Sequence, residues 1–168
     1  LVFRALRTHD RQHVVVKSLK NIPANSVEAV RLNHELEMIK RVEAENVIRV
    51  WGVERGSGIN ALVLEDFGAV SLKKILASSR IDVETTLRWA CQIAEGLVKI
   101  HERNILHKDI NASNVVVNVE ACRAKITDFG ISSLLSREDP RPCNPNLLEG
   151  TIQYISPEQT GRMNHAVD

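Results

Sequence analysis

The chain has 168 residues, 43% of them hydrophobic and 26% charged, which is the composition of a single globular domain and excludes a disordered tail. Lys and Arg number 22 against 21 Asp and Glu, so the net charge of +1 gives no reason to expect a nucleic-acid or membrane-surface partner. The longest apolar runs, such as "VVV" and "ALVL", are far too short to form a segment that spans a membrane.

The first third of the sequence predicts a sheet with one helix. Strands are expected at 1–8 and 12–19, on either side of a turn at "THDRQ". Ser26 is a candidate N-cap for a helix that runs to about residue 42 with apolar residues at helical spacing. "VIRVWGVE" and "NALVLEDF", joined by "RGSG", then predict another antiparallel strand pair.

The middle of the chain is predicted to be helical. "SLKKILASS" predicts a short helix, and residues 83–103 predict the longest one. The apolar residues of the long helix recur every three to four positions and predict one buried stripe, formed by Leu87, Ala90, Ile93, Ala94, Leu97 and Ile100. Two short strands follow at 115–118 and 124–127, and four prolines argue against regular structure from 137 to 157.

A polar segment, "HKDINASN" (107–114), follows the long helix and contains Asp109 and Asn114. Asp128 opens "DFG" directly after the next strand pair. Asn114 and Asp128 offer the hard oxygen ligands that suit Mg²⁺, and Asp109 is left free to accept or orient a hydroxyl proton. Each residue alone would most often be an ordinary turn residue. Together they indicate phosphoryl transfer, which needs metal ions on the phosphates and a residue that aims the nucleophile.

The first third also supplies a cation for the α- and β-phosphates of a nucleotide. Lys17 ends the Val-rich strand, and Glu35 on the following helix could hold its side chain in place. Lys17 alone would usually be a solvated lysine, and Glu37 is a rival for the pairing role. The spacing favours Glu35, because the neighbouring apolar residues of the helix then face inward.

These segments resemble a known family. In this order, "VVVK", "HKDINASN", "DFG" and "GTIQYISPE" are similar to the motifs of eukaryotic-type protein kinases. A closer resemblance, carried by "LVLEDFG", "HKDINASN" and "LLEGTIQYISPEQTGRMN", is to the serine/threonine-kinase-like domain at the N-terminus of hybrid sensor histidine kinases.

The resemblance implies a protein-kinase-like bilobal α+β fold. Residues 1–66 would form a partial, β-rich N-lobe with one helix, and 67–168 the first part of a helical C-lobe. The chain lacks an initiator Met and a glycine-rich loop, so we expect a fragment that is truncated at both ends, lacks the later C-lobe helices and is inactive by itself.

The resemblance also implies a role for each matching residue, with ATP and Mg²⁺ as cofactors. Asp109 would be the catalytic base, and the other catalytic positions would be Lys17, Glu35, Asn111 and Thr151. Magnesium would be held by Asn114 and Asp128. The nucleotide would be bound by Lys17, Val15, Leu64, Glu65, Phe67, Val116, Asn114 and Asp128, with residues 65–67 as the hinge, Leu64 as the gatekeeper, and Val15 and Val116 on either side of the adenine. His107, Phe129 and Ile39 would stack as an internal spine.

Two of the departures from the family pattern bear on regulation and catalysis. Lys108 stands where Arg is usual and lacks the bidentate fork of Arg, which weakens the expectation of control by loop phosphorylation, although Ser132, Ser133 and Ser136 are available. Asn111 stands where serine/threonine kinases usually have Lys, so the charge on the γ-phosphate is lost and transition-state stabilisation should fall.

The predicted function is transfer of the ATP γ-phosphate to Ser or Thr hydroxyls of proteins, and "GTIQY" favours Ser/Thr over Tyr. The alternative is a pseudokinase-like, nucleotide-binding regulatory module within a multidomain two-component signalling protein. A small-molecule kinase is disfavoured by "GTIQYISPE".

The expected partners are a protein substrate and covalently linked signalling domains beyond this chain. Cys91, Cys122 and Cys143 lack C-x-x-C spacing, so we expect free thiols and a cytoplasmic location.

Overall fold

The computed structural model describes residues 1–20, 26–56, 59–134 and 150–160. The elements of the first part are β1 (Val2–Leu6), β2 (His13–Lys20), α1 (Val27–Arg41), β3 (Val50–Gly56) and β4 (Ile59–Glu65). Those of the second part are β5 (Val70–Ser71), α2 (Leu72–Ser78), α3 (Val83–His101), β6 (Ile105–Leu106), β7 (Val115–Asn118), β8 (Arg123–Ile126), β9 (Ser133–Leu134) and the 3-10 helices η2 (Ile152–Tyr154) and η3 (Glu158–Thr160). Within the described ranges, every helix is too short or too polar to cross a bilayer.

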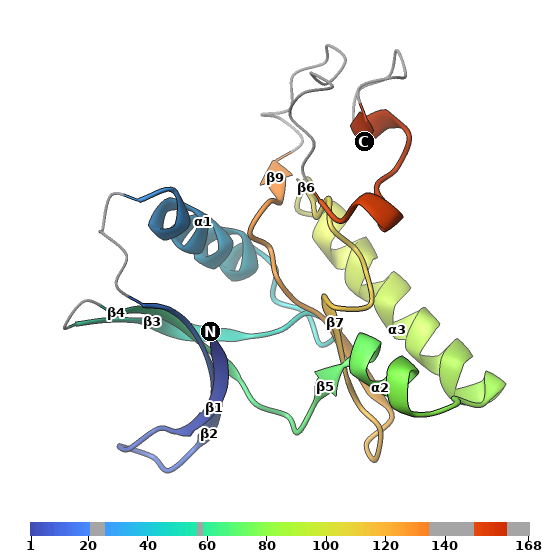
Figure 1. Cartoon of the computed structure of the whole chain (residues 1–168), viewed down its shortest axis with the longest axis horizontal. Coiled ribbons are helices and arrows are strands. Elements are labelled where there is room, and N and C mark those ends of the chain that lie inside the picture. The colour runs from blue at the N-terminus through green and yellow to red at the C-terminus, as the bar shows by residue number, and fades with distance from the viewer. Residues whose placement is uncertain (21–25, 57–58, 135–149, 161–168) are drawn as a thin grey trace.

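The first part is a four-stranded antiparallel sheet in the order β1-β2-β4-β3, with α1 beside it (Figure 1). Val15 on β2 pairs with Leu64 on β4, and Lys17 pairs with Leu62. Residues two apart on a strand point to the same face, so Val15 and Lys17 share one face of the sheet. The register therefore places Val15 opposite the last residue but one of β4, and Lys17 two residues further back along that strand.

Helix α1 begins as the sequence predicts. The Oγ atom of Ser26 accepts a hydrogen bond from the backbone N–H of Ala29 at 3.1 Å, which satisfies one of the free N–H groups of the first turn. Leu32, Ile39 and Val42 are buried, as expected from the spacing, whereas Val30 is 61% exposed. The buried face of the helix also carries one charged side chain, that of Glu35, whose partner lies in the candidate site.

The second part contains two small sheets, β5-β7-β8 and β6-β9, the α-helices α2 and α3, and the 3-10 helices η2 and η3 (Figure 1). β7 and β8 correspond to the predicted strands at 115–118 and 124–127. The sequence did not predict β5, β6 and β9, because two-residue strands carry no alternation to detect. In 150–160 the only regular elements are η2 and η3, while the rest of the proline-rich segment, 137–149, lies outside the described residues.

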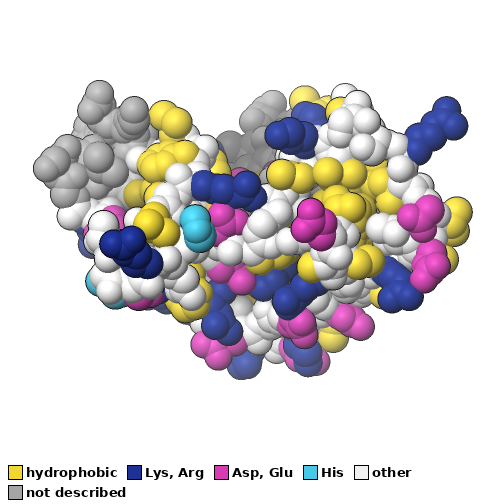
Figure 2. Space-filling model, turned by 90° about the horizontal axis from the view of Figure 1, so that it is seen from below, with side chains coloured by type: hydrophobic (Ala, Val, Ile, Leu, Met, Phe, Trp, Pro, Cys, Tyr) yellow, Lys and Arg dark blue, Asp and Glu magenta, His cyan; other side chains and the backbone are white. Residues whose placement is uncertain are grey.

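The predicted stripe on α3 is partly wrong. Ile100 is buried and Ile93 and Leu97 are partly buried, but Leu87 is 60% exposed, and Ala90 and Ala94 are exposed as well. The buried residues of the helix are Trp89, Gly96 and Ile100. The sheet β5-β7-β8 covers only a narrow strip of α3. The spacing of the apolar residues therefore predicted the helix correctly but not the width of its buried face. Hydrophobic atoms gather on the right-hand half of Figure 2, among interspersed charges of both signs.

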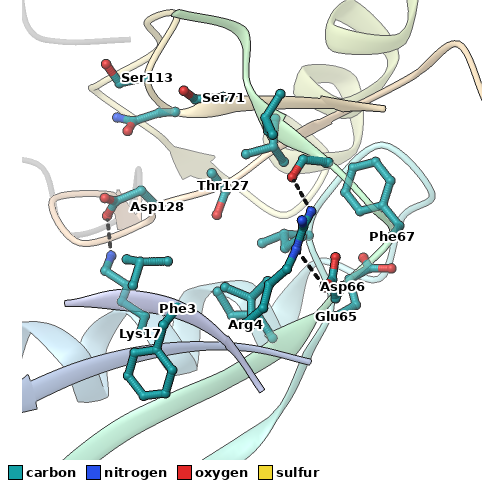
Figure 3. A pocket seen from close by; sticks show the side chains of 18 of the residues that line it. Phe3, Arg4, Lys17, Glu65, Asp66, Phe67, Ser71, Ser113, Thr127 and Asp128 are labelled. Carbon is teal, nitrogen blue, oxygen red and sulfur yellow. Dashed lines mark hydrogen bonds and ion pairs between the residues drawn. The ribbon is translucent and has the colours of Figure 1, made fainter. Parts of the chain in front are cut away.

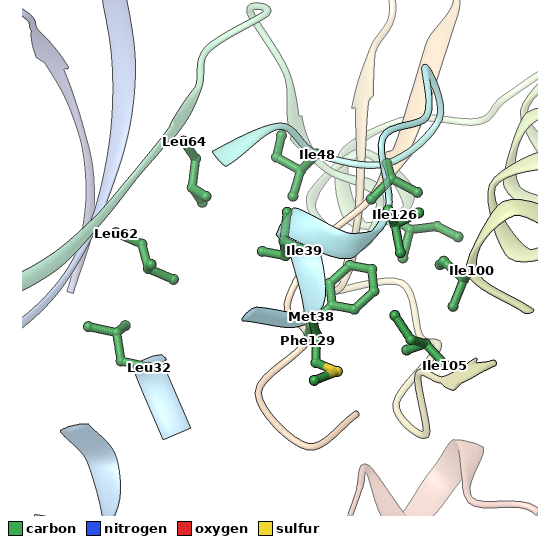
Figure 4. Packing of buried hydrophobic residues seen from close by; sticks show 12 residues of the cluster. Leu32, Met38, Ile39, Ile48, Leu62, Leu64, Ile100, Ile105, Ile126 and Phe129 are labelled. Atoms are coloured by element: carbon green, nitrogen blue, oxygen red, sulfur yellow. The ribbon is translucent and has the colours of Figure 1, made fainter. Parts of the chain in front are cut away.

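A continuous core joins the two parts (Figure 4). Leu62 and Leu64 of β4, Met38 and Ile39 of α1, Ile100 of α3, Ile105, Ile126 and Phe129 all belong to one buried cluster. The ring of His107 contacts that of Phe129 edge to face, with 4.8 Å between ring centroids. The residues expected to form the internal spine therefore lie in or against this cluster.

Candidate active site

A pocket of about 610 Å³ lies between the four-stranded sheet and the β5-β7-β8 sheet (Figure 3). This volume falls in the usual range for small-molecule sites. All the residues predicted to bind nucleotide line it, namely Val15, Lys17, Leu64, Glu65, Phe67, Asn114, Val116 and Asp128. They come from β2, the end of β4 and the segments around β7 and β8, so the fold gathers residues that are more than a hundred positions apart.

Lys17 is the central cation of this pocket. Its Nζ atom lies 2.7 and 2.9 Å from the two carboxylate oxygens of Glu35 and 2.9 Å from Oδ1 of Asp128. The side chain of Glu35 is only 3% exposed, whereas that of Asp128 is 43% exposed. Glu35, rather than Glu37, is therefore the partner of Lys17, as the spacing predicted.

Burial and pairing act on these charges in opposite directions. Burial alone lowers the pKa of Lys17, but the attraction of Glu35 and of Asp128 outweighs it, and the pKa of Lys17 lies above its usual value. Burial raises the pKa of Glu35, and the nearby Lys17 offsets only part of this shift. The ammonium group of Lys17 thus stays charged at neutral pH and faces the pocket.

Asp109 is held by two donors on its two oxygens. The backbone N–H of Thr151 donates to Oδ1 at 2.9 Å, and Nδ2 of Asn114 donates to Oδ2 at 2.7 Å. Burial alone raises the pKa of Asp109, but hydrogen bonds from Thr151 and then Asn114 outweigh it, so its pKa lies below the ordinary value. The result is an ionised carboxylate in a fixed orientation.

Asn111, which stands where the family usually has Lys, is buried and fully engaged in local contacts. Its Nδ2 atom donates to Oγ1 of Thr151 at 3.1 Å and to the backbone oxygen of Asp109 at 3.2 Å. Its Oδ1 atom accepts from the backbone N–H of Ser113 at 2.7 Å. Asn111 therefore ties the 107–114 loop to Thr151.

His107 supports the same loop in a neutral form. Its Nδ1 atom accepts from the backbone N–H of Asp109 at 3.3 Å, so Nε2 carries the proton and donates to the backbone oxygen of Thr127 at 3.1 Å. Burial lowers the pKa of His107, and the hydrogen bond to Thr127 only partly opposes this shift. His107 thus joins the Asp109 loop to the segment that leads into Asp128.

Three residues at the site have left-handed backbone. Lys108 has φ 65°, Asp128 has φ 67° and Gly150 has φ 110°. Such conformations are strained for residues other than glycine and cluster at functional sites. A Cβ atom on Gly150 would lie 3.2 Å from the backbone oxygen of Lys108, so glycine also permits the close approach of this segment to the Asp109 loop.

Asn114 and Asp128 carry side-chain oxygens of the kind that bind a divalent cation. Nδ2 of Asn114 is committed to Asp109, which leaves its amide oxygen as the acceptor. Asp128 lines the pocket with a partly exposed carboxylate. Two hard oxygen donors on the wall of the pocket match the few protein ligands that Mg²⁺ usually accepts.

The hydroxyl groups of Ser132 and Ser133 are not accessible for phosphorylation in this structure. Ser132 is 3% exposed, and its hydroxyl donates to the backbone oxygen of Phe129 at 2.7 Å. The hydroxyl oxygen of Ser133 is buried as well. Neither hydroxyl is exposed to solvent in this arrangement, and Ser136 lies outside the described residues.

Sequence reasoning missed Arg4, which crosses one edge of the pocket (Figure 3). Its Nε atom lies 2.9 Å from Oδ2 of Asp66, and its Nη2 atom donates to the backbone oxygen of Ala69 at 2.9 Å. It also missed Lys125, which pairs with Glu65 from behind the pocket. A lone basic residue in a strand carries no signal of its partner, because the partner is set by tertiary structure.

Comparisons with known proteins agree with this geometry. The family model described as "Protein kinase domain" matches residues 1–168. The chain is 31% identical over 143 residues to the serine/threonine-protein kinase STE11 of Saccharomyces cerevisiae, covering 84% of this chain and 20% of that protein. It is 29% identical over 161 residues to a probable serine/threonine-protein kinase of Clostridium acetobutylicum, covering 95% and 24%. It is 32% identical over 154 residues to the human mitogen-activated protein kinase kinase kinase 6, covering 89% and 12%. The chain thus spans about a quarter or less of the length of these relatives.

Proposed function

The chain belongs to the protein kinase domain family, and on that premise we propose that it transfers the γ-phosphate of ATP to Ser or Thr hydroxyls of a protein substrate. The observation that carries the proposal is the placement of Lys17 between Glu35 and Asp128 on the wall of a nucleotide-sized pocket. The names of the relatives, which are serine/threonine-protein kinases, support the choice of hydroxyl.

The proposed roles follow from charge and reach. The ammonium of Lys17 would bind the α- and β-phosphates, with Glu35 fixing its position. Asn114 and Asp128 would hold Mg²⁺, which when bound neutralises charge on the phosphates. The base of the nucleotide would lie between Val15 and Val116, against the hinge at 65–67 and beside Leu64, all of which line the pocket.

Asp109 would receive the proton of the attacking hydroxyl. The hydroxyl oxygen forms a bond to the γ-phosphorus, the bond from that phosphorus to the β,γ-bridging oxygen breaks, and ADP leaves. The low pKa of Asp109 makes it a weak base, so its main contribution would be to orient the hydroxyl. Thr151 and Asn111 would keep the carboxylate and its loop in place.

We also propose a finer assignment for the whole protein. "LVLEDFG", "HKDINASN" and "TIQYISPEQTGRMN" support a place in a hybrid sensor histidine kinase of a two-component system, with signalling domains linked to this one. The division at 66/67 into an N-lobe and a C-lobe is proposed from the resemblance to protein kinases. Cys91 and Cys122 are free thiols, which supports a cytoplasmic location.

The test is transfer of labelled γ-phosphate from ATP to a generic Ser/Thr protein substrate by the full-length protein. Asp109→Asn and Asp128→Ala are the matched controls. Phosphate on Ser or Thr that disappears in both variants is the expected result. The contrary result is a protein that transfers no phosphate but binds ATP in a Mg²⁺-dependent way that Asp128→Ala weakens. That result would overturn the proposed kinase activity and support the nucleotide-binding regulatory module.

A further inference from the structure

The hinge has a charged support on the side away from the pocket. Lys125 lies on β8, and its side chain is 8% exposed. Its Nζ atom lies 2.6 Å from Oε1 of Glu65 and 5.2 Å from the centre of the Phe67 ring. A lysine is almost never this buried unless it is paired, so its place is fixed by these two hinge residues.

Two neighbouring groups complete this support. The backbone N–H of Arg49 donates to the same Oε1 of Glu65 at 2.7 Å, and Nδ2 of Asn118 donates to the backbone oxygen of Phe67 at 2.6 Å. Glu65 and Phe67 line the pocket, whereas Lys125, Arg49 and Asn118 do not. The residues that face a ligand are therefore held in position by residues that would not touch it.

The position of Lys125 in the chain gives this contact a further consequence. Lys125 is three residues before Asp128, and the backbone of β8 is itself fixed by hydrogen bonds between Ile126 and residues 46 and 48. The strand that carries Lys125 ends at Ile126 and leads directly to Asp128 on the wall of the pocket. Lys125 is therefore a side-chain link between the hinge and the segment that leads to Asp128.

We propose that Lys125 is a positioning residue for nucleotide recognition, which holds hinge residues 65–67 where their backbone can read the base. The proposal rests on the proposed function, because it assigns the base to the hinge. A buried charge that loses its partner must move, be solvated or change protonation state. Loss of the Lys125 ammonium leaves the Glu65 carboxylate with the backbone N–H of Arg49 but without its counterion, and we expect the hinge backbone beside it to shift.

The experiment measures the dissociation constants of ATP and GTP by displacement of a fluorescent nucleotide. Lys125→Met keeps the aliphatic stem over Phe67 and removes the charge, so the affinity for ATP should fall about tenfold. The affinity for GTP should fall less, so the preference for ATP over GTP should become smaller. Lys125→Arg keeps the ion pair and the ring contact and should retain the preference. Lys99→Met is the matched control, because it removes an exposed ion pair between Lys99 of α3 and Glu102. It should leave the dissociation constants of ATP and GTP unchanged.

A second variant covers the case in which Lys125→Met does not fold. The double variant Lys125→Met/Glu65→Met leaves no unpaired buried charge and should fold, yet the preference for ATP over GTP should still narrow. A variant that melts at a lower temperature, but keeps its ATP affinity and its preference for ATP within about twofold of the parent values, would show that Lys125 is purely structural. That result would overturn the inference and leave the proposed function unaffected.

Failure of the proposed function has a different signature. If the parent protein binds ATP in preference to GTP but transfers no phosphate, the kinase activity is overturned, and the binding constants still decide the role of Lys125. If the parent protein binds neither nucleotide, both proposals are overturned.

Discussion

Lys17 on β2 and Glu35 on α1 form an ion pair with 2.7 Å between Nζ and Oε2, and the carboxylate is almost completely buried. The same ammonium lies 2.9 Å from Asp128, after β8. One cation therefore links the sheet, the helix beside it and the second part of the chain. Any displacement of α1 would remove a buried counterion and move Lys17 within the pocket.

Glu35→Gln should lower kcat/KM for ATP by about tenfold or more, because the Lys17 ammonium loses its nearest charge and its fixed position. Steady-state kinetics at varied ATP would measure this loss. Glu37→Gln is the matched control, since Glu37 is an exposed residue on the same helix. Equal losses in the two variants would show that the charge of α1, and not the pair with Lys17, matters.

The contact between Asn111 and Thr151 can be tested with a double-mutant cycle. Asn111→Ala and Thr151→Val each remove one side of the 3.1 Å hydrogen bond. Each should lower kcat, and their effects should be non-additive by about 0.5–3 kcal/mol, as for residues in direct contact. Additive effects would mean that Asn111 acts elsewhere, for example on the phosphates, as the Lys expected at this position would.

The parts of the site that lie close together in the sequence could be predicted from it, whereas Lys17, Glu35 and Asp128 were assigned together through the resemblance to protein kinases. Ser26 caps its helix through a contact three residues away, and Asp109 and Asn114 lie in one loop. Pairs such as Arg4 with Asp66 and Lys125 with Glu65 join residues about 60 positions apart, and no local pattern indicates them. For the same reason the periodicity of α3 predicted a helix but not which of its apolar residues are covered.

Gly96 lies where α3 packs closely against the chain before β3. A Cβ atom there would lie 2.9 Å from the backbone oxygen of Asn46, which cannot move aside as a flexible side chain could. Gly96→Ala should therefore lower the free energy of unfolding by about 1–3 kcal/mol, measured by urea denaturation. Gly52→Ala is the control, because a Cβ atom on Gly52 meets nothing within 4 Å. A Gly96→Ala protein as stable as the parent would contradict the close approach.

His107 should make stability depend on pH in a defined direction. Burial lowers its pKa below the ordinary 6.5, so in the folded state it stays neutral while the unfolded chain takes up a proton. The unfolded state then binds more protons, and the free energy of unfolding falls as the pH drops below about 6.5, by up to about 1.4 kcal/mol per pH unit until the folded-state pKa is reached.

The measurement is urea denaturation between about pH 7.5 and 5.5, comparing slopes rather than absolute stabilities. His107→Gln removes the titrating group and should flatten the slope, even though the variant is less stable at every pH. His13→Gln, at an exposed histidine of β2, should keep the parent slope. Because every other titrating group except His13 is the same in all three proteins, the difference between the slopes isolates His107. Parallel slopes for His107→Gln and the parent would show that the imidazole takes up its proton as readily in the folded state as in the unfolded chain.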